Sequence, residues 1–178
     1  MSRLHTINPA QATGAAATLF AAIKGKIGMV PNAYAVIGNN SPLALEAALA
    51  LDGALAKSSL SAREIEVIKL VVSEDAACDY CLAAHTLIGK KAGLSKTAIL
   101  ALRHGTPSED ECADALATFV RHVSASKGTV AAPVFAAVKA AGYTDAQVVD
   151  TLLAIASITF TNLVNRVNDT VLDFPAAD

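Results

Sequence analysis

Residues 61–95 read SAREIEVIKLVVSEDAACDYCLAAHTLIGKKAGLS, and this stretch predicts two consecutive helices. Ser61 is followed three positions later by Glu64, the capping-box pattern in which each side chain binds a backbone N–H at the start of a helix. Apolar residues then recur three and four positions apart, which places them on one helical face. We therefore expect helices at about 61–75 and 77–92, joined by a short turn into an antiparallel hairpin.

The same helix signals recur along the whole chain, and no segment alternates apolar and polar residues as a half-buried strand does. Helix starts with a capping side chain are also expected at Asn8, Ser41, Ser108 and Thr144. The stretch 25–40 is rich in Gly, Pro and Asn, which predicts a loop with a short helical turn. The expected fold is an all-α, multi-helix bundle of about eight helices, at roughly 9–25, 41–57, 61–75, 77–92, 95–103, 108–127, 132–141 and 144–171.

The composition of the 178 residues is typical of closely packed helices, and we expect a single domain spanning 1–178. Hydrophobic residues make up 53% and charged residues 17%, which excludes a disordered chain because such chains are charge-rich and apolar-poor. The formal net charge of −2 leaves no basic excess to neutralise phosphates, so we expect no nucleic-acid partner. Three cysteines exclude a disulfide-stapled secreted scaffold. The surplus of apolar surface predicts a binding partner.

We expect neither a membrane span nor a signal peptide. The most apolar stretch, 152–164, is shorter than the ~20 residues that a spanning helix needs, and Ser, Thr and Asn interrupt it, so it is predicted to be a buried core helix. Near the start, the apolar run at 15–23 is followed by Lys24 and Lys26, where a signal peptide would carry a small-residue cleavage site. The sequence therefore indicates a cytoplasmic protein.

The candidate reactive residues of the chain lie close together in the sequence: Cys78, Cys81 and His85. On a helix the three side chains project at about 0°, 300° and 340°, on one narrow face. Asp75 is the expected N-cap, which places Cys78 near the helix start, where the helix dipole and free N–H groups stabilise a thiolate. His85 follows Cys81 by one turn and is the natural base to take its proton.

Three interpretations of this constellation compete: thiol redox catalysis through a Cys78–Cys81 disulfide, a metal site, and a set of small side chains in a helical core. A structural zinc site takes its further ligands from a second close pair. A histidine on the cysteine face makes a chance arrangement less common, and no βαβ pattern follows, which excludes a thioredoxin fold. We therefore expect redox chemistry without a metal. The remaining cysteine and histidines stand alone in the sequence: Cys112, His5, His104 and His122.

Glu66 is the candidate carboxylate for a proton relay. It precedes Cys78 by twelve residues, and its immediate neighbours are apolar, so its side chain is a candidate to face the core. An antiparallel hairpin would bring it beside His85, where a carboxylate orients the imidazole ring. The alternative is a solvated charge like that of Glu64, and spacing alone leaves both interpretations open.

The pattern Glu66-x11-Cys78-x-Tyr80-Cys81-x3-His85 resembles the signature of the AhpD-like alkylhydroperoxidases, within the carboxymuconolactone decarboxylase superfamily. The residues that flank it and the late stretch GYTDAQVVD also fit, and the resemblance covers about residues 40–170. It implies an all-α fold with a reactive helical hairpin, a trimeric or hexameric assembly, and a dithiol that reduces peroxides.

The resemblance also implies a role for each site residue. Cys81 would be the peroxidatic thiol that becomes a sulfenic acid, and Cys78 the resolving thiol and proton donor. His85 and Glu66 would form the relay that activates them. The substrate would be an alkyl hydroperoxide and the reductant an external dithiol, with no haem, flavin or metal. The best-known members carry His where this chain has Tyr80, and Tyr is not a base near neutral pH.

Two other functions are alternatives. A redox-sensing or adaptor protein would use the same disulfide without turning over peroxide. The decarboxylase branch of the superfamily generally lacks the C-x-x-C, because ring opening of a lactone acid needs a base and cation clamps, and this chain has no Arg or Lys cluster at the candidate site.

Two further groups of residues carry expectations. Cys112 is predicted to be a small buried hydrophobe, as free cysteines usually are. Three asparagines share one face of the last helix and either bond neighbouring helices or subunits, or line the site. They are Asn162, Asn165 and Asn168.

Overall fold

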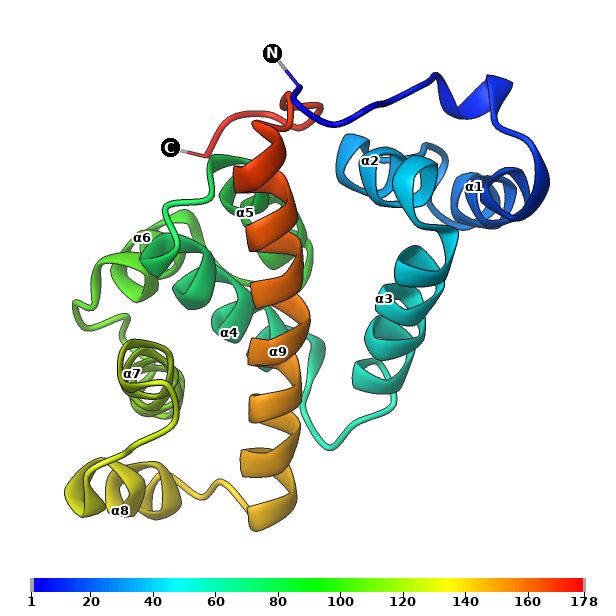
Figure 1. Cartoon of the computed structure of the whole chain (residues 1–178). Coiled ribbons are helices and arrows are strands. Elements are labelled where there is room, and N and C mark those ends of the chain that lie inside the picture. The colour runs from blue at the N-terminus through cyan, green and yellow to red at the C-terminus, as the bar shows by residue number, and fades with distance from the viewer. Residues whose placement is uncertain (1, 178) are drawn as a thin grey trace.

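The fold is all-α, as the sequence predicts. The computed structural model describes residues 2–177, and these form a 3-10 turn, η1, and nine α-helices, without a strand (Figure 1). Most predicted helix boundaries lie close to the observed ones. The elements are η1 Pro9–Gln11, α1 Gly14–Ile27, α2 Asn32–Asn40, α3 Pro42–Leu55, α4 Ala62–Asp75, α5 Asp79–Lys91, α6 Lys96–His104, α7 Glu111–Ser126, α8 Ala132–Ala140 and α9 Asp145–Asn168.

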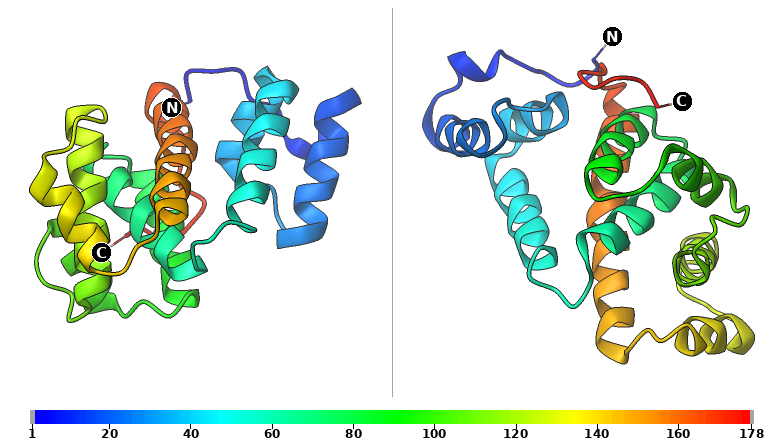
Figure 2. Two further views of the ribbon diagram at one scale, coloured as in Figure 1. Left: turned by 90° about the horizontal axis from the view of Figure 1, so that it is seen from below. Right: turned by 180° about the vertical axis from the view of Figure 1, so that it is seen from behind.

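Helix α4 is the centre of the main core. It packs against α5, α6, α7 and α9, and its side chains Ile68, Leu70 and Val71 are fully buried. Helix α9 runs along the molecule between two groups of helices, with α1–α3 on one side and α6–α8 on the other (Figure 1 and Figure 2). A smaller core joins α1–α3 around Phe20 and Leu45. The α4–α5 hairpin therefore packs directly against α9.

The prediction of a loop at 25–40 is wrong, because most of that stretch forms helix α2. No capping side chain marks its start, where Pro31 makes no side-chain hydrogen bond. Packing supports the helix instead: a Cβ on Gly38 would lie 2.5 Å from the Phe20 ring of α1 and 2.7 Å from Leu45 of α3. A helix this short depends on such tertiary contacts, which leave no local signal in the sequence.

The predicted helix starts at Ser61 and Thr144 are confirmed as complete capping boxes. The one at Asn8 is confirmed as a side-chain cap, although the helix predicted to follow it is interrupted, and the one at Ser108 is wrong. The Asn8 side chain caps only the short turn η1, and α1 begins after it. Helix α7 is capped by Asp110, whose side chain accepts from a backbone N–H in the first turn. The N-cap is therefore the Asp110 carboxylate, which lies directly before the helix, rather than the Ser108 hydroxyl.

Helix α9 is buried on one face only, so the prediction of a buried core helix at 152–164 is half right. Its inward face is largely polar, and polar side chains on that face hydrogen-bond to α4 and α5. By length and composition α9 is apolar enough to cross a membrane, and 28% of its apolar window is buried. Its outward face carries a stripe of large exposed apolar side chains, here called the α9 stripe: Val149, Leu152, Phe160, Leu163 and Val167.

Candidate active site

The cysteine pair lies at the start of α5, and Cys78 itself is the N-cap of that helix. Its Sγ accepts a hydrogen bond from the backbone N–H of Cys81 at 3.4 Å. The prediction that Asp75 caps this helix is wrong, because Asp75 ends α4 and the chain then turns through Ala77, whose φ is +47°. At an N-cap a sulfur faces the N–H groups and the positive end of the helix dipole, which favours a thiolate.

The two thiols are in direct contact. Cys78 Sγ lies 2.8 Å from Cys81 Sγ, and both side chains are free thiols that are buried. The hydrogen bond from the Cys81 thiol lowers the pKa of Cys78, and the Cys81 backbone N–H and the Arg166 guanidinium add to this effect. The same thiol–thiol bond, with burial and the charge on Cys78, raises the pKa of Cys81. Of the two thiols, Cys78 is therefore the one that loses its proton first.

This order of deprotonation differs from what the sequence led us to expect. We expected Cys81 to be the thiol that gives its proton to His85. The order of deprotonation is the reverse, because Cys78 holds the N-cap position and Cys81 lies inside the first turn.

Glu66 faces the interior, which decides between the two interpretations of this residue. Its side chain is 7% exposed, and its Oε2 lies 2.8 Å from His85 Nδ1. Glu66 comes from α4 and His85 from α5, so the antiparallel hairpin makes this contact. A carboxylate on Nδ1 orients the ring and leaves Nε2 as the nitrogen that can accept a proton.

Tyr80 makes structural contacts with its hydroxyl. The Tyr80 oxygen accepts from the backbone N–H of Ala33 at 3.1 Å and donates to Asp173 at 2.7 Å. The other oxygen of Asp173 accepts from the backbone N–H of Asn32 at 2.7 Å, and the Tyr80 ring packs edge-on against Phe174. Burial raises the pKa of Tyr80 well above its usual range. We call this arrangement the Tyr80 clasp, since it ties α5, α2 and the C-terminal segment together.

The three asparagines of α9 divide between the two roles that the sequence left open. Asn162 bonds α4 through Ser73, and Asn168 accepts from backbone N–H groups near the N-terminus. Asn165 instead donates to Cys81 Sγ at 3.3 Å. Hydrogen bonds from Asn165 and Thr161 both act to lower the pKa of Cys81, although the opposing effects are larger. Thr161 carried no signal in the sequence, because its contact is made only by the packing of α9 on α5.

Cys112 is exposed on α7, so the prediction that it is buried is wrong. Its backbone carbonyl, rather than its thiol, faces inward and accepts from Tyr143 at 3.4 Å. The sulfur lies 3.6 Å from the carbonyl oxygen of Ala141. Within residues 2–177, no group of three or more His, Cys, Asp or Glu side chains has an arrangement that could hold a metal ion.

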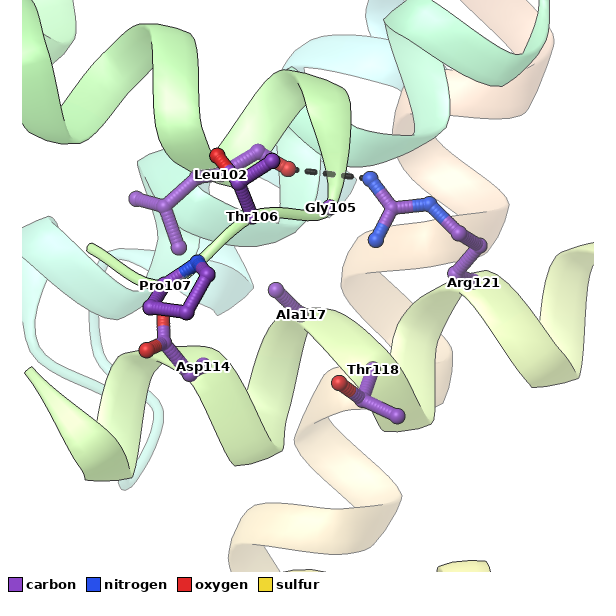
Figure 3. Close-up of a pocket in the computed structure, with 8 residues that line it drawn as sticks. All are labelled: Leu102, Gly105, Thr106, Pro107, Asp114, Ala117, Thr118 and Arg121. Carbon is purple, nitrogen blue, oxygen red and sulfur yellow. Dashed lines mark hydrogen bonds between the residues drawn. The ribbon is translucent and has the colours of Figure 1, made fainter.

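The surface formed by the described residues includes two hollows of different character. One, of about 180 Å³, lies between α6 and α7, where the Arg121 guanidinium bonds the Leu102 carbonyl (Figure 3). None of its lining residues belongs to the dithiol or the relay. The other, of about 280 Å³, is lined by apolar side chains together with Glu66 and the ion pair of Lys69 with Asp52. The Glu66 carboxylate, although mostly buried, therefore borders a surface hollow.

Residues 42–120 match the model of the carboxymuconolactone decarboxylase family. The fold is similar to the alkylhydroperoxidase AhpD core of an uncharacterized peroxidase-related protein from Ralstonia eutropha JMP134, with a TM-score of 0.83 and 21% identity over 97% of this chain and 92% of that chain. A protein of unknown function from Agrobacterium tumefaciens, with a proposed role as antioxidant defence protein AhpD, gives a TM-score of 0.70 and 25% identity over 77% and 95%. The chain therefore has the AhpD-like fold, and its central part resembles the carboxymuconolactone decarboxylase family in sequence.

This AhpD-like chain also has the fold of a protein named for a different reaction. A cysteine-to-alanine variant of the debrominase Bmp8, in complex with 2,3,4-tribromopyrrole, gives a TM-score of 0.79 and 17% identity over 97% of this chain and 92% of that chain. No curated protein matches the chain in sequence. The AhpD-like fold is thus common to proteins described by more than one activity, and the activity of this chain must be argued from its own site.

Proposed function

We propose that this AhpD-like protein is an enzyme, a thiol-dependent peroxidase that reduces alkyl hydroperoxides through Cys78 and Cys81. The observation that supports this most directly is the contact of two buried thiols at 2.8 Å on the helix that also carries the Glu66-paired His85. Two adjacent thiols supply the two electrons that cleavage of an O–O bond requires. An imidazole held by a carboxylate supplies a site for the proton that leaves the pair.

In the proposed cycle His85, oriented by Glu66, takes one of the two thiol protons. The remaining proton passes from Cys81 to Cys78, and the Cys81 thiolate attacks the terminal oxygen of the hydroperoxide. The O–O bond breaks, Cys78 gives its proton to the departing alkoxide, and an alcohol and a Cys81 sulfenic acid result.

The second half of the cycle returns the site to its neutral form. The Cys78 thiolate attacks the Cys81 sulfur, and a disulfide forms. The S–O bond breaks, and the proton held on His85 converts the departing hydroxide into water. An external dithiol then reduces the disulfide by thiol–disulfide exchange, which restores both thiols. The balance is one dithiol and one hydroperoxide to one disulfide, one alcohol and one water, with no cofactor.

Domain organisation, cellular location and assembly are part of the proposal. We propose that residues 1–178 act as one AhpD-like domain in the cytoplasm, where a reducing environment keeps exposed Cys112 and the buried pair as thiols. We also propose that the α9 stripe is covered by further copies of the chain in a trimer or hexamer. Exposed apolar stripes of this kind mark protein interfaces in soluble proteins.

A steady-state assay of peroxide consumption tests the function, with alkyl, lipid and hydrogen peroxides and with dithiothreitol and other dithiols as donors. The wild-type protein is expected to turn over, and Cys81→Ser to lose turnover. Cys78→Ser should accumulate a sulfenic acid on Cys81 that reacts with dimedone. Cys112→Ser is the control, and it should retain wild-type rates. Reversible disulfide formation without turnover, with every peroxide and donor, would instead indicate a redox-sensing or adaptor protein.

A further inference from the structure

Asn165 holds a buried amide against the sulfur of Cys81. The residue lies on α9 and is 4% exposed. Its Nδ2 donates to Cys81 Sγ at 3.3 Å, across 84 residues of sequence. Its Oδ1 is buried and has no hydrogen-bond partner among the described residues. The amide nitrogen therefore donates to the thiol, and the amide oxygen remains available as a hydrogen-bond acceptor.

The free carbonyl of Asn165 is one of four buried side-chain oxygens without a partner among the described residues, and its amide is the one that contacts Cys81. Buried polar groups almost always have a hydrogen-bond partner, because an unpaired one loses its interaction with water. The neighbouring asparagines of α9 follow this rule. Asn162 bonds Ser73 and the Val72 carbonyl, and Asn168 bonds backbone N–H groups and Thr170. The unpaired oxygen of Asn165 thus points to a donor that arrives only during function.

We propose that Asn165 is a catalytic residue that recognises the O–H group of the hydroperoxide and of the sulfenic acid formed from it. This inference rests on the proposed peroxidase function. The Nδ2–H bond stabilises the Cys81 thiolate before attack. The Oδ1 atom accepts from the terminal O–H of the hydroperoxide and then, once that oxygen has moved to sulfur, from the O–H of the Cys81 sulfenic acid. No additional reactant enters, because the O–H group is the one that the substrate brings.

The proposal specifies the class of peroxide that the site accepts. An alkyl or lipid hydroperoxide and hydrogen peroxide each carry an O–H donor, whereas a dialkyl peroxide does not. A dialkyl peroxide would leave Asn165 Oδ1 buried and unpaired, which is costly, so the site selects against it. Asn165 would therefore set both the reactivity of Cys81 and the selectivity for hydroperoxides.

The first test measures the Cys81 thiol without any turnover. In a Cys78→Ser, Cys112→Ser background Cys81 is the sole remaining cysteine, and its rate of alkylation by iodoacetamide is followed against pH. Asn165→Leu removes the donor, and nearly isosteric Asn165→Asp replaces it with a negative charge. Both are expected to move the alkylation profile to higher pH, by about one to two units. Asn162→Leu, one turn away on α9, is the matched control and should lower the melting temperature without moving the profile.

The second test follows the oxygen acceptor. In the same background, the Cys81 sulfenic acid formed by tert-butyl hydroperoxide is trapped with dimedone, and its formation rate is corrected for the thiolate fraction. Asn165→Leu should slow formation about tenfold, whereas Asn165→Asp, which keeps an acceptor, should be slowed less. An unchanged alkylation profile in both variants, or equal corrected rates, would overturn the proposal. Failure of the peroxidase function would be seen earlier, as a wild-type protein that does not consume hydroperoxide while its thiol titration remains measurable.

Discussion

The imidazole of His85 and the carboxylate of Glu66 lie 2.8 Å apart, on two helices joined by a tight turn. Both side chains are mostly buried, with 12% and 7% of their surface exposed. When the ring takes a proton, the carboxylate balances its positive charge. This matters because water solvates a charge poorly at a buried position. Loss of that charge should impair proton transfer from the dithiol while it leaves the hydrogen bond and the shape of the pair in place.

Glu66→Gln is therefore expected to lower kcat/KM for hydroperoxide by about 10- to 100-fold, the usual effect of removing a partner that orients and supports a functional histidine. The loss should be present across neutral pH, and the melting temperature should change little, since Gln can still bond Nδ1. Exposed Glu46→Gln on α3 is the control and should keep wild-type kinetics. Equal kinetics in both variants would remove Glu66 from the relay.

The contact between the two thiols predicts an ordered titration. The pKa of Cys78 is lowered by the Cys81 thiol, and the pKa of Cys81 is raised. As the pH rises, Cys78 should therefore lose its proton first, at a pH below the ordinary pKa of a cysteine thiol. Thiolate absorbance at 240 nm in Cys112→Ser protein should thus show one sulfur titrating early and the other late. Cys81→Ala removes the donor and should return the pKa of Cys78 towards its ordinary value. A Cys78 titration that is the same with and without Cys81 would contradict the hydrogen bond with Cys81 as the cause of the lowered pKa.

Removal of the Tyr80 hydroxyl is predicted to destabilise the fold. Tyr80→Phe leaves the Ala33 N–H and the Asp173 carboxylate without their common partner, which should cost about 1–3 kcal/mol of unfolding free energy. Thermal denaturation should show a melting temperature lower by several degrees. Release of the C-terminal segment should also speed proteolysis within residues 169–177. Tyr143→Phe, whose hydroxyl makes a longer bond of 3.4 Å, is the control and should leave that proteolysis rate unchanged.

Much of the fold could be predicted because its signals are local. The capping boxes at Ser61 and Thr144 involve residues three positions apart, so the sequence alone specifies them. Helix α2 could not be predicted, because it depends on the close approach of Gly38 to Phe20 and Leu45, which are on other helices. The polar inward face of α9 was misjudged for the same reason, since it is defined by its bonds to α4 and α5.

The candidate site divides in the same way. Helical spacing placed Cys78, Cys81 and His85 on one face, and a hairpin was enough to bring Glu66 to them. The polar surroundings of the pair come from distant parts of the chain, and no spacing rule connects them. Asn165 reaches Cys81 across 84 residues, and Asp173 reaches Tyr80 across 93. The order in which the two thiols lose their protons also required the structure, because it depends on Cys78 rather than Asp75 being the N-cap.

The α9 stripe predicts that the protein assembles with copies of itself. Its members recur three, four or eight positions apart along one face, and Leu163 and Val167 are 60% and 59% exposed in the isolated chain. Leu163→Glu with Val167→Glu would place two charges in a desolvated interface, so light scattering coupled to size-exclusion chromatography should report a smaller assembly than for the wild type. Circular dichroism should show unchanged helix content, because both residues face away from the core. Ile27→Glu, on the 53% exposed side chain at the end of α1, should leave the assembly intact. A wild-type protein that is monomeric at micromolar concentration would refute the assignment of this stripe to a homo-oligomer.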